Sequence, residues 1–212
     1  MGFEKLGWKD ETATLPYFTA GEGRALLYLH SGGGAHPSRV LEELGNDRRV
    51  IAPVMPGFNG TSLIDGVSSM RALAQLMGEF TDEIIGEDCD VMAQSFGGWV
   101  ALWLALERPE LVDQLILESP AGLRPKGKGG LAKTPDEVQK QLYVHPENLR
   151  PEDISDEDPK AVMARLRHYN EAGVSMDEDL AGRLSEIQSL TLVLMGVEDT
   201  VIPPDTGWLL KV

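Results

Sequence analysis

A serine at the corner between an expected strand and an expected helix is the residue best suited to chemistry. The apolar run 90–94 predicts a buried strand, and a helical pattern begins directly after Ser95. Such a corner strains the backbone of its apex residue, so its neighbours must be small, as Ala93 and Gly97 are. Amides of the first helical turn, Phe96 included, can stabilise negative charge. The corner indicates a nucleophile, although an inert serine in a glycine-rich turn fits this segment equally well.

A glycine-rich loop follows a second expected strand. Residues 24–30 predict a buried strand that ends in His30, and Ser31 and the glycines 32–34 come next. Glycines let the backbone approach a ligand closely and expose amide donors. Segment 31–38 contains no lysine and no GxGxxG pattern, so a nucleotide-binding loop is not indicated. An oxyanion-binding loop fits this segment better than a phosphate cradle.

Expected strands and helices alternate along the chain. Residues 4–20 predict an opening hairpin, residues 36–44 predict a helix, and residues 50–54 predict a further strand. Apolar residues at three- and four-residue steps over 68–85 predict an amphipathic helix, whereas helix 96–106 is apolar on nearly every side and should be buried. This alternation predicts an α/β fold with a mostly parallel, doubly wound sheet.

The composition is that of one globular domain. The 212 residues carry a net charge of −15, which disfavours nucleic acid and anionic membrane surfaces as partners. No apolar run approaches the roughly 18 residues of a membrane helix, and residues 1–10 lack a signal-peptide core, so we expect a cytoplasmic protein. Cys89 is the only cysteine, so neither an intrachain disulfide nor a cysteine-based metal site is expected.

Five segments resemble, in the right order, motifs of the α/β-hydrolase superfamily. They are the loop 29–34, the strand and turn 50–62, the corner 93–97, the helix exit 107–112 and the strand 115–123. Ser31 occupies a position where glycine is usual, and Ala93 replaces the first glycine of Gly-x-Ser-x-Gly. Asn59 adds a residue to the Pro-Gly-Phe-Gly-x-Ser turn, unless Gly60 to Ser62 supplies the Gly-x-Ser match.

The resemblance implies a helical cap inserted into the sheet. Residues 1–122 and 188–212 would form the α/β-hydrolase core, and residues 123–187 would form the cap or lid over the active site. Helices are expected in this insertion at 135–142, 159–172 and 177–187, with enough apolar residues to bury a face. A solvated surface excursion is the other interpretation of this segment.

The resemblance also implies a catalytic serine and an oxyanion hole. Ser95 would attack a carbonyl group, and the amides of Gly32, Gly33 and Phe96 would bind the resulting oxyanion. His30 would order the glycine loop without acting as the base.

The acid would lie in the loop after an expected buried strand at 190–195. Asp199 matches the family's acid, which orients a histidine in the correct tautomer. Glu198 and Glu118 are carboxylates that could be confused with it or replace it. The non-catalytic interpretation of Asp199 is an aspartate that caps a turn or a helix.

The histidine base is the element that the sequence does not provide. The superfamily places it after the acid, beyond one more strand, and no histidine follows Asp199. The four histidines are His30, His36, His145 and His168, and none occupies the required position. We therefore expect a C-terminally incomplete form that lacks the last strand, the histidine loop and the last helix. A natural variant that binds ligands without turnover is the alternative.

For the complete protein these features predict a serine hydrolase of small carboxylic esters. The alternative within enzymes is hydrolysis of a carbon–carbon bond in a vinylogous diketone, which uses the same triad. A nucleophilic serine argues against epoxide opening and halide removal, for which relatives carry aspartate. The expected partner is a small-molecule substrate, no metal or organic cofactor is implied, and the oligomeric state is left open.

Overall fold

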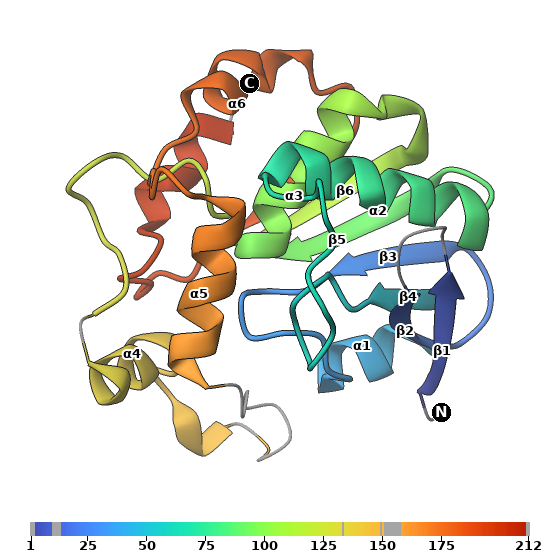
Figure 1. Ribbon diagram of the computed structural model, residues 1–212, viewed down its shortest axis with the longest axis horizontal. Coiled ribbons are helices and arrows are strands. Elements are labelled where there is room, and N and C mark those ends of the chain that lie inside the picture. Colours follow the sequence, from blue (N-terminus) through green and yellow to red (C-terminus); the bar gives the residue numbers. More distant parts are fainter. Residues whose placement is uncertain (1–2, 10–13, 133, 149, 151–157, 211–212) are drawn as a thin grey trace.

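A seven-stranded mixed sheet forms the centre of the computed structural model, which describes residues 3–9, 14–132, 134–148, 150 and 158–210 (Figure 1). The strand order is β1-β2-β4-β3-β5-β6-β7. The strands are β1 (Glu4–Lys9), β2 (Thr14–Ala20), β3 (Ala25–Leu29), β4 (Arg49–Pro53), β5 (Cys89–Gln94), β6 (Val112–Glu118) and β7 (Leu190–Leu194). β1 pairs antiparallel with β2, and β2 with β4, whereas every pairing from β4 to β7 is parallel. The mostly parallel sheet predicted from the sequence is confirmed.

Helices pack on both faces of this sheet because successive side chains of a strand point to opposite sides. On β3, Leu26 packs with Leu41 of α1 (Arg39–Leu44). The next residue, Leu27, belongs to the larger cluster on the other face, which is covered by α2 (Met70–Ile84) and α3 (Phe96–Glu107). The core therefore lies mainly between the sheet and these two helices.

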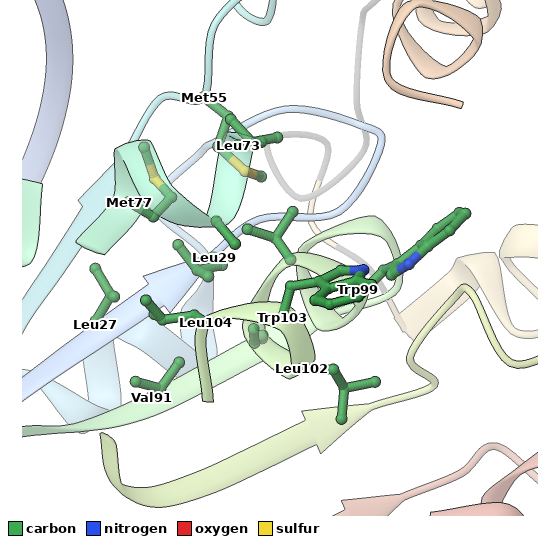
Figure 2. Packing of buried hydrophobic residues seen from close by; sticks show 14 of the residues in the cluster. Leu27, Leu29, Met55, Leu73, Met77, Val91, Trp99, Leu102, Trp103 and Leu104 are labelled. Carbon is green, nitrogen blue, oxygen red and sulfur yellow. The ribbon is translucent and has the colours of Figure 1, made fainter. Parts of the chain in front are cut away.

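The helix that follows Ser95 is the most deeply buried of these elements. Every residue of α3 from Phe96 to Leu106 is buried, as its apolar sequence predicts. Figure 2 shows Trp103 and Leu104 of this helix among Leu27 and Leu29 of β3 and Met77 of α2. A helix packed on all sides gives the Ser95 corner a rigid support.

Some expected helices are shorter in the structure. The helix expected at 36–44 begins at Arg39, because the Ser38 hydroxyl accepts a hydrogen bond from the Leu41 amide (3.4 Å) and caps the helix there. The one expected at 159–172 is α5 (Pro159–Tyr169), which ends where Asn170 leaves the helical conformation. The last, expected at 177–187, divides into α6 (Glu178–Arg183) and a 3₁₀ turn, Leu184–Glu186.

The chain leaves the core near Leu123 and returns to it near Met176, and these two points are paired with each other. Leu123 and Met176 form an antiparallel bridge, and the Asp177 amide donates to the Gly122 carbonyl (2.7 Å). The Asp177 carboxylate also accepts hydrogen bonds from the indoles of Trp99 (2.9 Å) and Trp103 (3.0 Å) on α3. Within the 123–187 segment lie α4 (Pro135–Leu142) and α5, and Figure 1 shows α5 beside the carboxyl ends of β3 and β5.

The prediction that strand 190–195 is buried is wrong for one of its faces. Leu190, Leu192 and Leu194 are 76%, 54% and 44% exposed. β7 is the edge strand of the described sheet and pairs only with β6 there, and no described helix covers the face that carries these leucines. The apolar sequence of a strand reports its preference for burial, whereas burial itself depends on which neighbours are present.

In the described part of the chain, no helix combines the length and the apolar character needed to cross a lipid bilayer.

Candidate active site

The Ser95 corner has the strained geometry expected of it. β5 ends at Gln94 and α3 begins at Phe96, and Ser95 between them has φ 50° and ψ −110°. A conformation of this kind costs on the order of 1–3 kcal/mol and persists only where its surroundings impose it. Here the Ser95 amide donates to the Glu118 carbonyl (2.9 Å), and the Ser95 carbonyl accepts from the Ala121 amide (2.9 Å).

Gly97 allows α3 to approach the end of β3. A Cβ atom at this position would lie 2.2 Å from the Leu29 carbonyl oxygen and 2.5 Å from that of His30. No side chain fits at such distances, because both atoms belong to the backbone. The sequence predicts that Gly97 is small to leave space around Ser95. In the structure Gly97 also lets the serine corner lie directly against the His30 loop.

His30 is buried and both of its ring nitrogens are engaged. Nδ1 lies 2.7 Å from the Ser31 carbonyl oxygen, and Nε2 accepts a hydrogen bond from the Met55 amide (3.0 Å). An amide can only donate, so Nε2 is unprotonated and Nδ1 carries the hydrogen. Burial, together with smaller contributions from the nearby charges of His36 and Arg165, lowers the pKa of His30 to about 4. A neutral histidine in these bonds is suited to ordering the loop.

This environment predicts a loss of stability in mild acid. Since the folded-state pKa of about 4 lies below the ordinary value of 6.5, the unfolded chain binds more protons between these values. Stability is therefore full above pH 6.5 and falls as the pH drops through this window, by about 2 kcal/mol from His30 between pH 7 and pH 5. Urea unfolding at several pH values measures it. His30→Gln should remove this part of the slope and His36→Gln should keep it; equal slopes in wild type and His30→Gln would contradict the assignment.

The three glycine amides of the loop at 32–34 differ in their hydrogen bonds. The Gly33 amide donates to the Ser31 hydroxyl (3.3 Å) and the Gly34 amide to the Ser31 carbonyl (3.1 Å). The Gly32 amide makes no hydrogen bond with any residue that the structure describes. Ser31, which departs from the usual glycine, thus holds Gly33, and Gly32 is the better candidate donor for an oxyanion.

Asp199 lies in the loop that follows β7. Its Oδ1 accepts hydrogen bonds from the amides of Val201 (2.9 Å) and Ile202 (2.8 Å), as a turn-capping aspartate does. The loop is held from the 123–187 segment, because the Gly130 amide donates to the Val201 carbonyl (2.9 Å). These bonds engage one carboxylate oxygen only, and the catalytic role of Asp199 stays a prediction.

The other two carboxylates have different surroundings. Glu198 is exposed and lies 3.9 Å from Nε2 of His145. Glu118 accepts a hydrogen bond from the side chain of Gln94 (3.1 Å), its partner across the β5–β6 ladder. Neither carboxylate holds a histidine near Ser95 in the described structure.

None of the four histidines is hydrogen-bonded to Asp199 within the described residues. His30 is engaged as above, His168 Nε2 bonds the Val67 carbonyl (3.0 Å), and His145 Nδ1 lies 3.1 Å from Glu147. His36 is half-buried in the loop before α1. The structure thus brings together the serine corner and the His30 loop, and it leaves the base unassigned.

Arg165 is a residue of the site that the sequence analysis missed. Its guanidinium lies 5.0 Å from the ring centroid of Phe58, and its charge lowers the pKa of His30. On α5 it shares a face with Val162, Leu166 and Tyr169, and the first two lie next to Gly32. A cation on the apolar face of an amphipathic helix is the sequence signal that could have identified it.

An aromatic row connects α5 with the serine corner. The Tyr169 ring centroid is 5.7 Å from that of Phe96, which is 5.4 Å from that of Phe58. The buried Tyr169 hydroxyl donates to the Pro56 carbonyl (2.8 Å), and burial raises its pKa. These contacts pack α5 against the buried Phe96 and against the turn that contains Pro56.

Comparison with known proteins decides the family. The model of the alpha/beta hydrolase family matches residues 26–209. The chain is a member of this family. The membership predicted from the five motifs is therefore confirmed.

Among curated proteins, the chain is similar to hydrolases named for a dienoate or a muconate semialdehyde. A 2-hydroxy-6-oxo-6-phenylhexa-2,4-dienoate hydrolase from Comamonas testosteroni is 31% identical over 241 residues, covering 97% of this chain and 82% of that protein. A 2-hydroxymuconate semialdehyde hydrolase from Pseudomonas sp. (strain CF600) is 30% identical over 227 residues, covering 89% and 75%. These relatives match the carbon–carbon hydrolase set above as the alternative to an esterase.

Solved structures of α/β hydrolases agree in fold. A 2-hydroxy-6-oxo-6-phenylhexa-2,4-dienoate hydrolase from Rhodococcus sp. strain RHA1 superposes with a TM-score of 0.72 at 20% identity, covering 99% of this chain and 86% of that one. A serine hydrolase involved in carbazole degradation superposes with a TM-score of 0.76 at 21% identity, covering 99% and 85%.

Proposed function

We propose that this α/β hydrolase cleaves a carbon–carbon bond in 2-hydroxy-6-oxo-dienoic acids. The observation that carries the proposal is the position of Arg165, a cation beside the His30 loop. A dienoic acid is an anion, and a guanidinium binds a carboxylate through charge-assisted, often bidentate hydrogen bonds. The names of the relatives at 30% and 31% identity support the same substrate class.

The proposed roles follow from the geometry of the corner and the loop. Ser95 attacks the carbonyl carbon at position 6, and the amides of Gly32 and Phe96 donate to the oxygen that becomes negative. Before this attack the 2-hydroxy group loses its proton and carbon 5 gains one, which converts the dienol into its 2-oxo tautomer, and the Ser95 hydroxyl proton passes to the base during the attack. When the carbonyl at position 6 re-forms, the bond between carbons 5 and 6 breaks, and its electron pair is delocalised onto the 2-oxo oxygen as a dienolate, which then takes up a proton. Water then releases the acyl group from Ser95. Asp199 would orient the imidazole that serves as base.

We also propose that residues 123–187 act as the cap over this site. The support comes from α5, whose side chains contact the turn 55–58 and approach Gly32. Val162, Leu166 and Tyr169 would provide an apolar wall for the organic part of the substrate, while Arg165 binds its carboxylate.

Two other functions remain to be distinguished from this one. Hydrolysis of small carboxylic esters uses the same nucleophile and oxyanion donors but has no need of the cation at Arg165. A ligand-binding protein without turnover would keep the pocket and leave Ser95 unreactive.

Paired turnover assays test the proposal. We expect kcat/KM for a 2-hydroxy-6-oxo-dienoate, followed by loss of its conjugated absorbance, to exceed that for a neutral ester of similar size by about tenfold or more. Faster hydrolysis of the neutral ester would favour the esterase. Binding of the dienoate, measured by calorimetry, without turnover of either compound and without phosphonate labelling of Ser95 would favour the binding protein.

A further inference from the structure

We infer that Asn59 is a positioning residue that holds the oxyanion loop in its working geometry, an inference that rests on the proposed function. The Asn59 Oδ1 accepts a hydrogen bond from the Ala35 amide (2.8 Å), and its Nδ2 donates to the Ala35 carbonyl (3.0 Å). One side chain thus pairs with both backbone groups of a buried residue 24 positions earlier, as a neighbouring strand would.

The backbone of Asn59 suits an asparagine. Its φ of 49° lies in the left-handed region, which asparagine tolerates better than most residues. The surrounding turn is closed by the Thr61 amide and hydroxyl, which both donate to the Phe58 carbonyl (2.9 and 2.7 Å). Asn59, which directly follows the Pro-Gly-Phe run, therefore aims its amide group at the glycine loop.

Gly34 accommodates this amide group. A Cβ atom on Gly34 would lie 2.6 Å from Asn59 Oδ1, and Gly34 has φ 87°. The third glycine of the loop is thus required for contact with Asn59, and the structure assigns it no role as an oxyanion donor.

The loop is clamped at both ends to one turn. At its start, His30 bonds the Ser31 carbonyl and the Met55 amide; at its end, Asn59 bonds Ala35. Gly32 lies between the two clamps, and its amide is the proposed donor. Oxyanion stabilisation requires a donor held about 3 Å from the developing charge, so a loop released at one end should lose rate without losing substrate affinity.

Two substitutions separate the amide from the backbone conformation. Asn59→Gly keeps the left-handed conformation and removes both hydrogen bonds to Ala35. Asn59→Asp keeps an acceptor for the Ala35 amide but faces the Ala35 carbonyl with an oxygen where a donor stood. The matched control is Gly60→Asn, because Gly60 also has a positive φ (78°) and a Cβ there meets nothing within 4 Å.

The readouts do not depend on dienoate cleavage. We expect both Asn59 variants to lower the rate of Ser95 labelling by a fluorophosphonate, and kcat for a neutral p-nitrophenyl ester, about tenfold, with KM changed less than about twofold. Hydrogen exchange at the Ala35 amide should accelerate in Asn59→Gly, and Gly60→Asn should behave as wild type. Thermal unfolding identifies any variant that fails to fold.

The outcomes are separable. Wild-type labelling rates in a folded Asn59→Gly or Asn59→Asp protein would overturn the role of Asn59. A loss of kcat in Gly60→Asn as large as that in the Asn59 variants would also overturn it. Absence of dienoate cleavage in a wild-type protein that is labelled at Ser95 would overturn the proposed substrate alone. A wild-type protein that is not labelled at Ser95 would overturn both.

Discussion

Ser95→Ala should lower turnover of any substrate by about 10⁴-fold or more and abolish covalent labelling by a fluorophosphonate. The physical reason is that the reaction passes through a bond to the Ser95 oxygen, whereas the remaining oxyanion donors stabilise only the much slower attack by water. Mass spectrometry of the labelled protein, together with turnover assays, measures both effects. Because alanine fits the same corner without new contacts, the variant should fold as wild type.

Ser119→Ala is the matched control for this prediction. Ser119 is also a serine with positive φ (41°) directly after a parallel strand, and its amide donates to the Leu194 carbonyl (2.9 Å). Its substitution should leave the labelled residue unchanged. Label found on Ser119, or a Ser95→Ala protein that keeps its turnover, would contradict the assignment of the nucleophile.

Added imidazole tests the unassigned base within the same experiment. No histidine in the described residues bonds Asp199, so a small base from solution should accelerate labelling of Ser95 wherever the protein supplies none. Labelling that imidazole accelerates in wild type, with no labelling in Ser95→Ala, would show that the added base acts on the Ser95 hydroxyl. Rates that are already fast and insensitive to imidazole would show that a protein group performs this step.

Arg165→Met should lower kcat/KM for a 2-hydroxy-6-oxo-dienoate about a hundredfold and change that for a neutral ester less than about threefold. Methionine keeps an unbranched apolar stem against Phe58 and removes the charge, so the loss reports recognition of the carboxylate. Arg165→Lys should recover part of the effect, because lysine keeps the charge without the bidentate geometry.

Arg167→Met provides the comparison on the same helix. Arg167 is exposed and lies two residues after Arg165 on α5. Its substitution by methionine changes the net charge of the protein by the same amount as Arg165→Met does, but leaves the surroundings of the His30 loop unchanged. It should leave kcat/KM for both substrates near the wild-type value. If Arg165→Met reduces dienoate and ester turnover alike, Arg165 acts by supporting Phe58 and the proposed substrate class is wrong.

The serine corner and the elements around it could be read from the sequence because their signals are local. Residues 89–106 contain an apolar strand, a turn of small residues and an apolar helix. The periodicity and the size of the residues in each segment predict its structure. The same holds for the amphipathic pattern of α2. Helix ends were harder, since Ser38 and Asn170 act through single hydrogen bonds or dihedral angles that periodicity does not contain.

The burial of β7 and the role of Arg165 depended on neighbours distant in sequence. Leu190, Leu192 and Leu194 are as apolar as the residues of a central strand, but they lie at the edge of the described sheet. Arg165 meets Phe58 across more than a hundred residues, and no spacing rule connects the two. The sequence presented it as one of several charges on a helix.

The sequence by itself determined the family, the parallel sheet and the candidate nucleophile, because these rest on residues that are neighbours along the chain. Only the tertiary structure decided which groups meet at the serine corner and the neighbouring His30 loop: Gly97 against the backbone of β3, Asn59 across from Ala35, and Arg165 over Phe58. Such pairs form where the fold closes long loops, and their partners are set by packing in three dimensions, which a linear pattern does not record.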